Sequence, residues 1–229
     1  MQASSQLAST RFAAFPGTDF ARQEWSGFGA ALHLKVLTTP EERQVLVPLR
    51  KHAPMGVEDD LGAGLMPFES ARDDVGVVTA IYRGAKLVAT LRLVPSGLRL
   101  TAAERVWADR SAAPEILGPG NWEVGRLIVA PEERSPELLH QCFCMALQVL
   151  MDTREVEHFY AISTPAMARL WRRFGMHATA PLVGASGRPF VLVSGHVDAV
   201  AAALHVAVPQ RHPGLVAAAR HEEDMALAD

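Results

Sequence analysis

The chain alternates short apolar runs, which predict strands, with stretches in which apolar residues recur every three or four positions, which predict helices. Glycine, proline and threonine bound the apolar runs, as is typical of strand ends. Strands are predicted over residues 33–37, 76–82, 86–94, 122–129, 158–162, 176–183 and 189–197. Helices are predicted over residues 40–49, 102–108, 136–151, 165–174 and 198–208.

Turn and cap signals support these boundaries. Thr39 followed by Pro40 is typical of a helix start, because the threonine hydroxyl can accept a hydrogen bond from a helical N–H. Gly175 follows an apolar stripe and indicates a helix end. Gly84 lies between two apolar runs, which predicts a β-hairpin. The segment 53–74 is rich in glycine, proline and acidic residues and is expected to form a mobile loop.

The order of these elements indicates an α/β (α+β) fold, in which a mixed, mostly antiparallel central sheet has helices on both faces. A chain of 229 residues, 49% of them hydrophobic, can bury one sizeable core. We expect a single domain over residues 31–208, with an N-terminal arm over 1–30 and a C-terminal tail over 209–229.

Composition and charge narrow the classes of function. The net charge of −3 provides no basic field for nucleic acid or anionic lipid. No apolar run is long enough to span a bilayer, and the polar start lacks the features of a secretion signal, so we expect a cytoplasmic protein. The nine histidines and two cysteines do not have the spacing of a metal site.

The predicted strand over 122–129 carries the most informative polar pair. Glu123 and Arg126 interrupt an otherwise apolar run, and burying either charge alone is costly. Because side chains alternate along a strand, the two point to opposite faces unless a bulge re-aims one of them. They could form a strand-end ion pair. Alternatively, the acid could accept a proton beside an arginine that fixes it or binds a substrate carboxylate.

This strand and four other stretches resemble the acyl-homoserine-lactone synthases and the related N-acyl amino acid synthases, which belong to the GNAT acyltransferase superfamily. The resemblance covers roughly residues 31–197. The other matching stretches, in chain order, are Leu49-Arg50, Asp73-Asp74, the strand over 84–95 that contains Arg92, and the segment 163–175 that begins Ser163-Thr164-Pro165.

The resemblance implies an N-acyltransferase without a permanently bound cofactor. In such enzymes an amine attacks an acyl thioester carried by acyl carrier protein or coenzyme A, and the product is an N-acyl amino acid or an acyl-homoserine lactone. By this resemblance Glu123 is the general base, directly or through a water, and Arg126 acts beside it. The arginines hold a substrate carboxylate, Asp74 partners them, and two hydroxyl residues border the acyl chain. The residues assigned to substrate binding are thus Arg50, Asp74, Arg92, Ser163 and Thr164.

Two departures from the family bear on the substrates. The lactone synthases place a Phe and a Trp before the acidic pair, where they help to shape the S-adenosylmethionine site. This chain has Phe68 but no Trp there, which favours a plain amino acid or another small amine. GNAT enzymes that use coenzyme A place glycines in the turn that binds the pyrophosphate. Here residues 131–136 contain no glycine and two acidic residues, which favours acyl carrier protein; Arg134 and Ser135 are assigned to the donor phosphate.

A basic rim could receive an acidic carrier protein. Arg169, Arg172 and Arg173 share the polar face of a predicted helix, with Arg134 and Arg154 as further candidates; the same residues could equally form an ordinary solvated surface. Two rival functions also stay open. One is a catalytically silent GNAT-like module that binds an acyl carrier, and the other is an ordinary acetyl-coenzyme A-dependent acetyltransferase.

Overall fold

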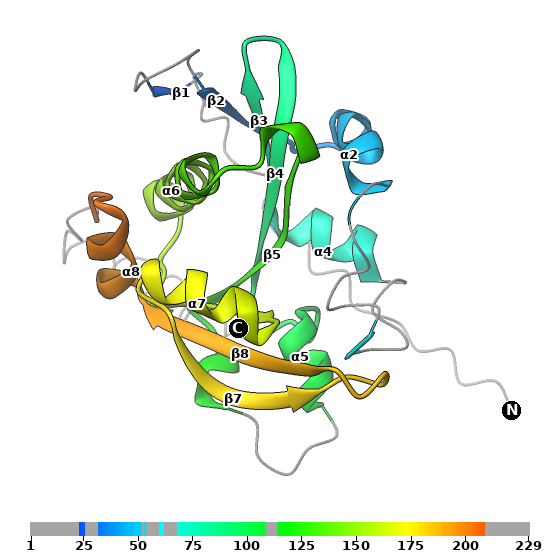
Figure 1. The fold of residues 1–229 in the computed structure, drawn as a ribbon, viewed down its shortest axis with the longest axis vertical. Helices are drawn as coiled ribbons and strands as arrows, with labels where there is room; N and C mark the ends of the chain where they lie inside the picture. The colour runs from blue at the N-terminus through cyan, green and yellow to red at the C-terminus, as the bar shows by residue number, and fades with distance from the viewer. Residues whose placement is uncertain are drawn as a thin grey trace, which may run out of the picture.

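The computed structural model describes residues 23–25, 32–51, 53, 60–61, 68–108 and 114–208. Its centre is an eight-stranded sheet in the order β1-β2-β3-β4-β5-β6-β8-β7 (Figure 1). Within it β5 and β6 are parallel, and every other neighbouring pair is antiparallel. The strands are β1 (Gln23–Trp25), β2 (Leu32–Val36), β3 (Val77–Arg83), β4 (Lys86–Pro95), β5 (Asn121–Val129), β6 (His158–Ser163), β7 (His177–Val183) and β8 (Pro189–His196).

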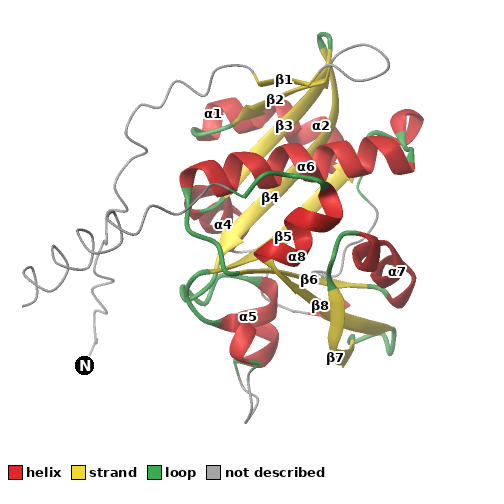
Figure 2. Ribbon diagram, turned by 90° about the vertical axis from the view of Figure 1, so that its left-hand side faces the viewer, coloured by secondary structure: helices red, strands yellow, loops and turns green. Residues whose placement is uncertain are grey.

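Helices cover both faces of this sheet (Figure 2). One face carries the long helix α6, and the opposite face carries α2 and α4. The predicted fold class, a mostly antiparallel sheet between helices, is therefore confirmed. The helices are α1 (Pro40–Arg43), α2 (Val47–Lys51), α4 (Glu69–Val75), α5 (Ala102–Trp107), α6 (Pro136–Thr153), α7 (Pro165–Arg173) and α8 (Val197–Leu204), with 3₁₀ turns at Gln44–Leu46, Glu115–Leu117 and Pro131–Glu133.

The local signals read from the sequence are present in the structure. Thr39 caps α1 in a capping box, in which its hydroxyl accepts from the Glu42 N–H at 3.3 Å and the Glu42 carboxylate accepts from the Thr39 N–H at 3.3 Å. Gly84 in the β3–β4 turn and Gly175 after α7 have φ angles of 60° and 78°. Glycine adopts these left-handed conformations without strain.

Three segments differ from the sequence-based expectation. The helix expected over 40–49 is divided into α1, a 3₁₀ turn and α2. The segment expected to be a loop contains a helix, α4, at its C-terminal end. The N-terminal arm contributes an edge strand, since β1 pairs with β2. The remainder of the expected loop and arm, together with the expected tail over 209–229, lies outside the described residues.

The main core lies between one face of the sheet and helices α6, α7 and α8. The stripe predicted on α6 is buried there, including Cys142, Phe143 and Leu147. On the other face, α5 contributes Trp107 to a smaller cluster with Phe190 and other residues of the β7–β8 pair.

Strands β5 and β6 pair over only three positions, which end at Glu123 opposite Tyr160. Beyond these residues both strands continue, to Val129 and Ser163, without pairing to each other. The central sheet therefore opens at Glu123. On the other side of β5, the register against β4 shifts between Thr90 and Arg92, which marks a β-bulge.

Candidate active site

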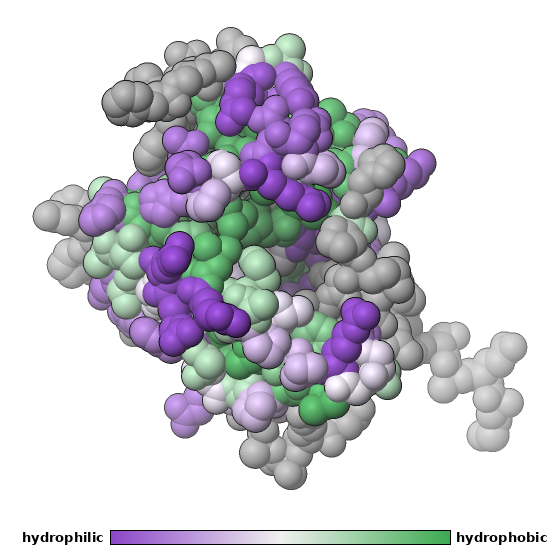
Figure 3. All heavy atoms as spheres, viewed as in Figure 1, coloured by the Kyte–Doolittle hydropathy of each residue, from purple (hydrophilic) through white to green (hydrophobic). Residues whose placement is uncertain are grey.

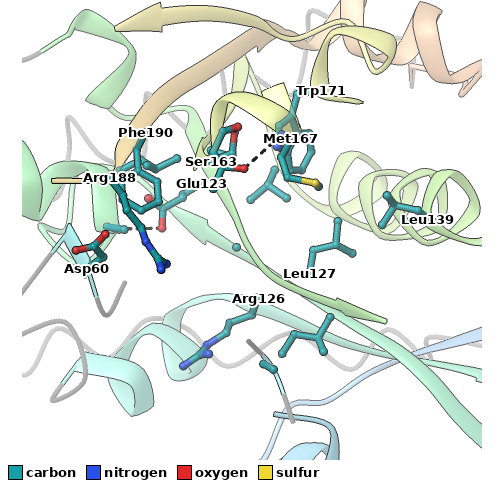
Figure 4. Close-up of a pocket in the computed structure, with 18 of the residues that line it drawn as sticks. Asp60, Glu123, Arg126, Leu127, Leu139, Ser163, Met167, Trp171, Arg188 and Phe190 are labelled. Carbon is teal, nitrogen blue, oxygen red and sulfur yellow. Dashed lines mark hydrogen bonds between the residues drawn. The ribbon is translucent and has the colours of Figure 1, made fainter. Parts of the chain in front are cut away.

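A cavity of about 650 Å³ lies where β5 and β6 diverge. In the space-filling view the hollow between α6 and α7 has apolar side chains along it (Figure 3), and Figure 4 shows the side chains that line the cavity. Among the polar side chains of the cavity, Glu123 lies at the vertex, the point where β5 and β6 diverge, and Ser186 and Arg188 lie on the β7–β8 hairpin. The apolar part of the wall consists of Val124, Leu127, Ile128, Leu139, Ala161, Ile162, Met167, Trp171 and Phe190.

Glu123 and Arg126 both line this cavity. Strict alternation along the strand would place them on opposite faces unless a bulge re-aimed one of them, and such a bulge is present between β4 and β5. Arg126 has a φ angle of 48°, in the left-handed region that non-glycine residues seldom adopt. The extra residue opposite Thr90 and Arg92 re-aims the side chains that follow Glu123.

The Glu123 carboxylate is 2% exposed and is held by three donors. Its Oε1 accepts from Arg72 Nη2 at 2.8 Å and from the Ala102 N–H at 3.0 Å. Its Oε2 accepts from the Ala103 N–H at 2.9 Å. The carboxylate thus faces the first N–H groups of α5 and a buried guanidinium, an arrangement that favours its ionised form. Arg72 is thus an ion-pair partner of Glu123 that the sequence analysis did not name.

A buried tyrosine positions α5 against Glu123. Tyr160 pairs with Glu123 across the two strands, and its hydroxyl donates to Thr101 Oγ1 at 3.1 Å. Thr101 is the N-cap of α5, so this contact fixes the helix end that faces the carboxylate. Burial, assisted by the charge of Glu123, raises the pKa of Tyr160 well above its ordinary value. Its hydroxyl therefore stays neutral and acts as a structural hydrogen-bonding group.

Glu69 of α4 binds three arginines that come from different elements. It accepts from Arg72 at 3.0 Å, from Arg92 at 3.1 Å and from Arg126 at 2.9 and 3.0 Å. Burial alone would raise the pKa of Glu69, but the charge and hydrogen bonds of Arg92, with the charges of Arg126 and Arg72, lower it to about 2. Arg126 is therefore held by Glu69 at the edge of the cavity.

Asp73, one turn later on α4, continues the same network. Arg50 of α2 donates to it at 2.5 and 3.1 Å, and Arg92 donates to it at 2.9 Å. Burial opposes ionisation of Asp73, yet its pKa is lowered because Arg50 and then Arg92 stabilise the carboxylate. We refer to Arg50, Glu69, Arg72, Asp73, Arg92, Glu123 and Arg126 as the ion-pair network.

The structure corrects the acidic residue assigned from the sequence. Asp74 pairs with Arg43 at 2.5 Å and is exposed, whereas its neighbour Asp73 makes the contacts to Arg50 and Arg92. Side chains one position apart on a helix point about 100° apart. Only one member of the Asp73-Asp74 pair can therefore face the sheet. Neither Arg50 nor Arg92 is among the residues that line the cavity.

The sequence analysis missed Glu69, Arg72 and Arg188, and it named Asp73 only as part of an acidic pair, without a role in the site. Glu69, Arg72 and Asp73 lie three and four positions apart, which places them on one side of a helix. That spacing was available in the sequence but was obscured by the surrounding loop-like composition. Arg188 lines the cavity from the start of β8, and no pattern near it in the sequence distinguishes it from an ordinary turn residue.

Ser163 and Thr164 line the cavity at the end of β6. Thr164 caps α7, since its hydroxyl accepts from the Met167 N–H at 3.4 Å, and the Ser163 hydroxyl donates to the Thr164 carbonyl at 3.3 Å. Met167 follows on the apolar wall. The assignment of both hydroxyl residues to the border of an acyl chain remains a prediction, and their position agrees with it.

The two acidic residues of the turn before α6 were expected to add negative charge near the donor phosphate, but both are paired with basic residues. Glu133 pairs with Arg83 and, at 2.9 Å, with Lys86, and Glu132 pairs with Lys86 at 3.0 Å. The β3–β4 hairpin therefore neutralises both acidic residues of this turn.

The two residues assigned to the donor phosphate lie in the same turn. Arg134 is exposed, and its Nε donates to the Val129 carbonyl at 3.3 Å. Ser135 caps α6, with its hydroxyl accepting from the Leu138 N–H at 3.1 Å. Neither is among the residues that line the cavity, and their contact with a donor phosphate remains a prediction.

The described residues include no group of three His, Cys, Asp or Glu side chains that could hold a metal ion. The two cysteines are free and buried, and burial raises the pKa of Cys142 to about 12 and that of Cys144 to about 11. Cys144 Sγ lies 3.6 Å from His140 Nδ1. Among the helices of the described ranges, none has the length and hydropathy needed to cross a membrane.

A family model described as N-acyl amino acid synthase FeeM matches residues 63–193, more than half of the chain. The chain belongs to this family. The matched segment contains α4, β5 with Glu123 and Arg126, the residues at the end of β6, and Arg188. The protein is therefore an acyltransferase, and the family predicted from the sequence is confirmed. A search of curated proteins found no match.

Several solved structures share the fold of this chain. FeeM, an N-acyl amino acid synthase from uncultured soil microbes, is 15% identical with a TM-score of 0.56, over 73% of this chain and 91% of FeeM. The AHL synthase LasI is 13% identical with a TM-score of 0.53, over 80% of this chain and all of LasI. AAC(6')-Ib, in complex with paromomycin and acetyl-coenzyme A, is 11% identical with a TM-score of 0.52, over 73% of this chain and 94% of AAC(6')-Ib.

Proposed function

We propose that this acyltransferase moves an acyl group from an acyl thioester to the amine of an amino acid and forms an N-acyl amino acid. The observation that carries the proposal is the cavity where β5 and β6 diverge, since its wall is apolar and Glu123 lies at its vertex. An acyl chain suits the apolar wall, because each buried methylene contributes about 0.8 kcal/mol. The acyltransferase domain of this proposal spans residues 31–208, and we propose that it acts in the cytoplasm.

The reaction needs one proton acceptor near the attacking nitrogen. The neutral amine attacks the thioester carbonyl carbon, the C–N bond forms, the C–S bond breaks, and the thiolate leaves. The amine gives up a proton, which Glu123 accepts directly or through a water and which then neutralises the thiolate. Arg72 and the α5 N–H groups favour the ionised carboxylate, so Glu123 is available as an acceptor before the amine binds.

Product analysis tests this function directly. The purified protein is incubated with acyl thioesters of several chain lengths and a mixture of amino acids, and the products are analysed by mass spectrometry. We expect an N-acyl amino acid, whose head group identifies the acceptor. Binding of the thioester without turnover would instead support a silent acyl-carrier-binding module. Turnover of acetyl-coenzyme A in preference to every longer acyl chain would support an ordinary acetyltransferase.

We further propose that acyl carrier protein is preferred to coenzyme A as the acyl donor. At the start of α6, Pro136 has no N–H and the Leu138 N–H is already donated to Ser135. The helix therefore has fewer free N–H groups for a pyrophosphate than an uncapped start would have. Arg83 and Lys86 neutralise the acidic residues of this turn, so the capped start of α6 and the lack of glycine are the features that disfavour a pyrophosphate.

A comparison of donors with the same acyl chain checks this preference. We expect a higher kcat/KM with the acyl carrier protein thioester than with acyl-coenzyme A. Three exposed arginines on α7, in a region where hydrophilic side chains gather (Figure 3), offer a surface for an acidic carrier: Arg169, Arg172 and Arg173. An equal or higher kcat/KM with acyl-coenzyme A would contradict the preference.

A further inference from the structure

We infer that Arg188 binds the carboxylate of the amino acid acceptor. It would thereby make the enzyme prefer acceptors that carry this carboxylate to simple amines that lack it. This inference rests on the proposed function. Arg188 precedes β8 and lines the same cavity as Glu123 and Arg126. Figure 4 shows its side chain extending from the β7–β8 hairpin past Asp60 toward the open part of the cavity.

The arginines assigned to this role from the sequence are already matched by carboxylates of the protein. Arg92 is 0% exposed and lies between Glu69 and Asp73. Arg50 donates twice to Asp73. Arg126 reaches the cavity, but its Nε and Nη2 both donate to Glu69. A substrate carboxylate could bind any of the three only by displacing a protein carboxylate or by adding negative charge beside it, which is unfavourable.

Arg188 differs from these arginines in its exposure and in its lack of a hydrogen-bonded carboxylate within the described residues. Its side chain is exposed, and within the described part of the chain its guanidinium makes no hydrogen bond or ion pair. The charge of Arg188 contributes to the lowered pKa of Asp60, but no hydrogen bond or ion pair joins the two, so the guanidinium keeps its N–H donors for a ligand. A planar guanidinium with five N–H donors suits two-point recognition of a carboxylate.

The backbone around Arg188 is nevertheless well fixed. The Arg188 carbonyl accepts from the Gly184 N–H at 2.9 Å and closes the turn. Asp60 holds the tip, because its carboxylate accepts from the Ser186 N–H at 2.7 Å and from the Ser186 hydroxyl at 2.6 Å. These bonds to Ser186, and to a smaller extent the charge of Arg188, lower the pKa of Asp60, so it remains ionised while it anchors the hairpin. A fixed backbone with an uncommitted side chain is a suitable platform for binding an anion.

The arrangement assigns one region of the cavity to each part of the product. The apolar wall takes the acyl chain, Glu123 lies nearest the nitrogen that attacks, and Arg188 receives the carboxylate. Arg126, held by Glu69, is then a positioning residue that shapes the bulge of β5 rather than the principal carboxylate ligand.

The test compares two acceptors in two variants. Steady-state kinetics are measured with the amino acid that gives the highest rate and with the amide of the same amino acid, which lacks the negative charge. In Arg188→Gln we expect KM for the amino acid to rise about ten- to a hundred-fold, as for the loss of hydrogen bonds to a charged group. We expect kcat at saturation and KM for the amide to stay within about three-fold. Arg188→Lys should restore part of the loss, since it keeps the charge but not the planar fork.

Arg99→Gln provides the matched control, because Arg99 is an exposed arginine that does not line the cavity. It should leave KM for both acceptors unchanged. An equal rise for the acid and the amide in Arg188→Gln, or no rise for either, would overturn the inference while the proposed function stands. Failure of the wild-type protein to acylate any amino acid would overturn the proposed function and this inference together.

Discussion

Replacement of Glu69 by glutamine is expected to destabilise the folded protein by about 3 kcal/mol at neutral pH, the free energy that corresponds to a pKa lowered from 4.5 to about 2. The substitution keeps the size of the side chain but removes the negative charge that faces Arg72, Arg92 and Arg126. Arg92 is fully buried, so its charge would be left with less compensation. Urea unfolding of the two proteins measures the difference.

The same residue predicts how stability depends on pH. The folded-state pKa of Glu69 is below its ordinary value, so its contribution is complete above about pH 4.5 and is lost as the pH falls toward about 2. The difference between wild type and Glu69→Gln should therefore shrink over this range. Asp73 has a pKa shifted in the same direction, so the variant retains part of the acid sensitivity.

Glu155→Gln serves as the control, because Glu155 is exposed. It should change stability by less than about 0.5 kcal/mol, as is usual for surface substitutions. If Glu69→Gln proved as stable as this control at neutral pH, the ion-pair network would not be a source of stability.

Most strands and helices could be predicted from the sequence because their signals are local. The apolar runs of β3 and β4 and the apolar stripe of α6 are complete within each element. α4 was missed for the opposite reason. Its seven residues are mostly charged, and the groups that stabilise them, Arg50 and Arg92, come from other parts of the chain. Pairing with distant charges is not visible in a local pattern.

The site was predicted in part. Glu123, Arg126, Ser163 and Thr164 all line the cavity. The first two lie on β5 where it separates from β6, and the other two lie between the end of β6 and the start of α7. The bulge at Arg126 depends on the register between β4 and β5, which alternation alone does not specify. Arg188 comes to the cavity through the β7–β8 hairpin, whose position depends on the fold as a whole.

Replacement of Glu123 by glutamine is expected to lower kcat by about 10²–10⁴-fold, the usual range for the loss of a general base. The structure adds a second effect that the sequence did not indicate. Because Glu123 pairs with the buried Arg72, the substitution should also destabilise the protein by about 3–5 kcal/mol. Activity must therefore be measured well below the unfolding transition and corrected for the folded fraction.

Arg72→Met separates the two effects, since it breaks the same ion pair from the other side. Arg72 is not among the residues that line the cavity, and the Glu123 carboxylate keeps its hydrogen bonds from the Ala102 and Ala103 N–H groups in this variant. If Glu123 accepts the proton, both variants unfold more easily, yet Arg72→Met keeps kcat within about ten-fold of wild type per folded molecule. The comparison distinguishes a carboxylate needed for chemistry from one needed only for folding. Equal losses of kcat in the two variants would show that Glu123 supports the shape of the β5–β6 junction, and the proton acceptor would then have to be sought among the other polar groups of the cavity.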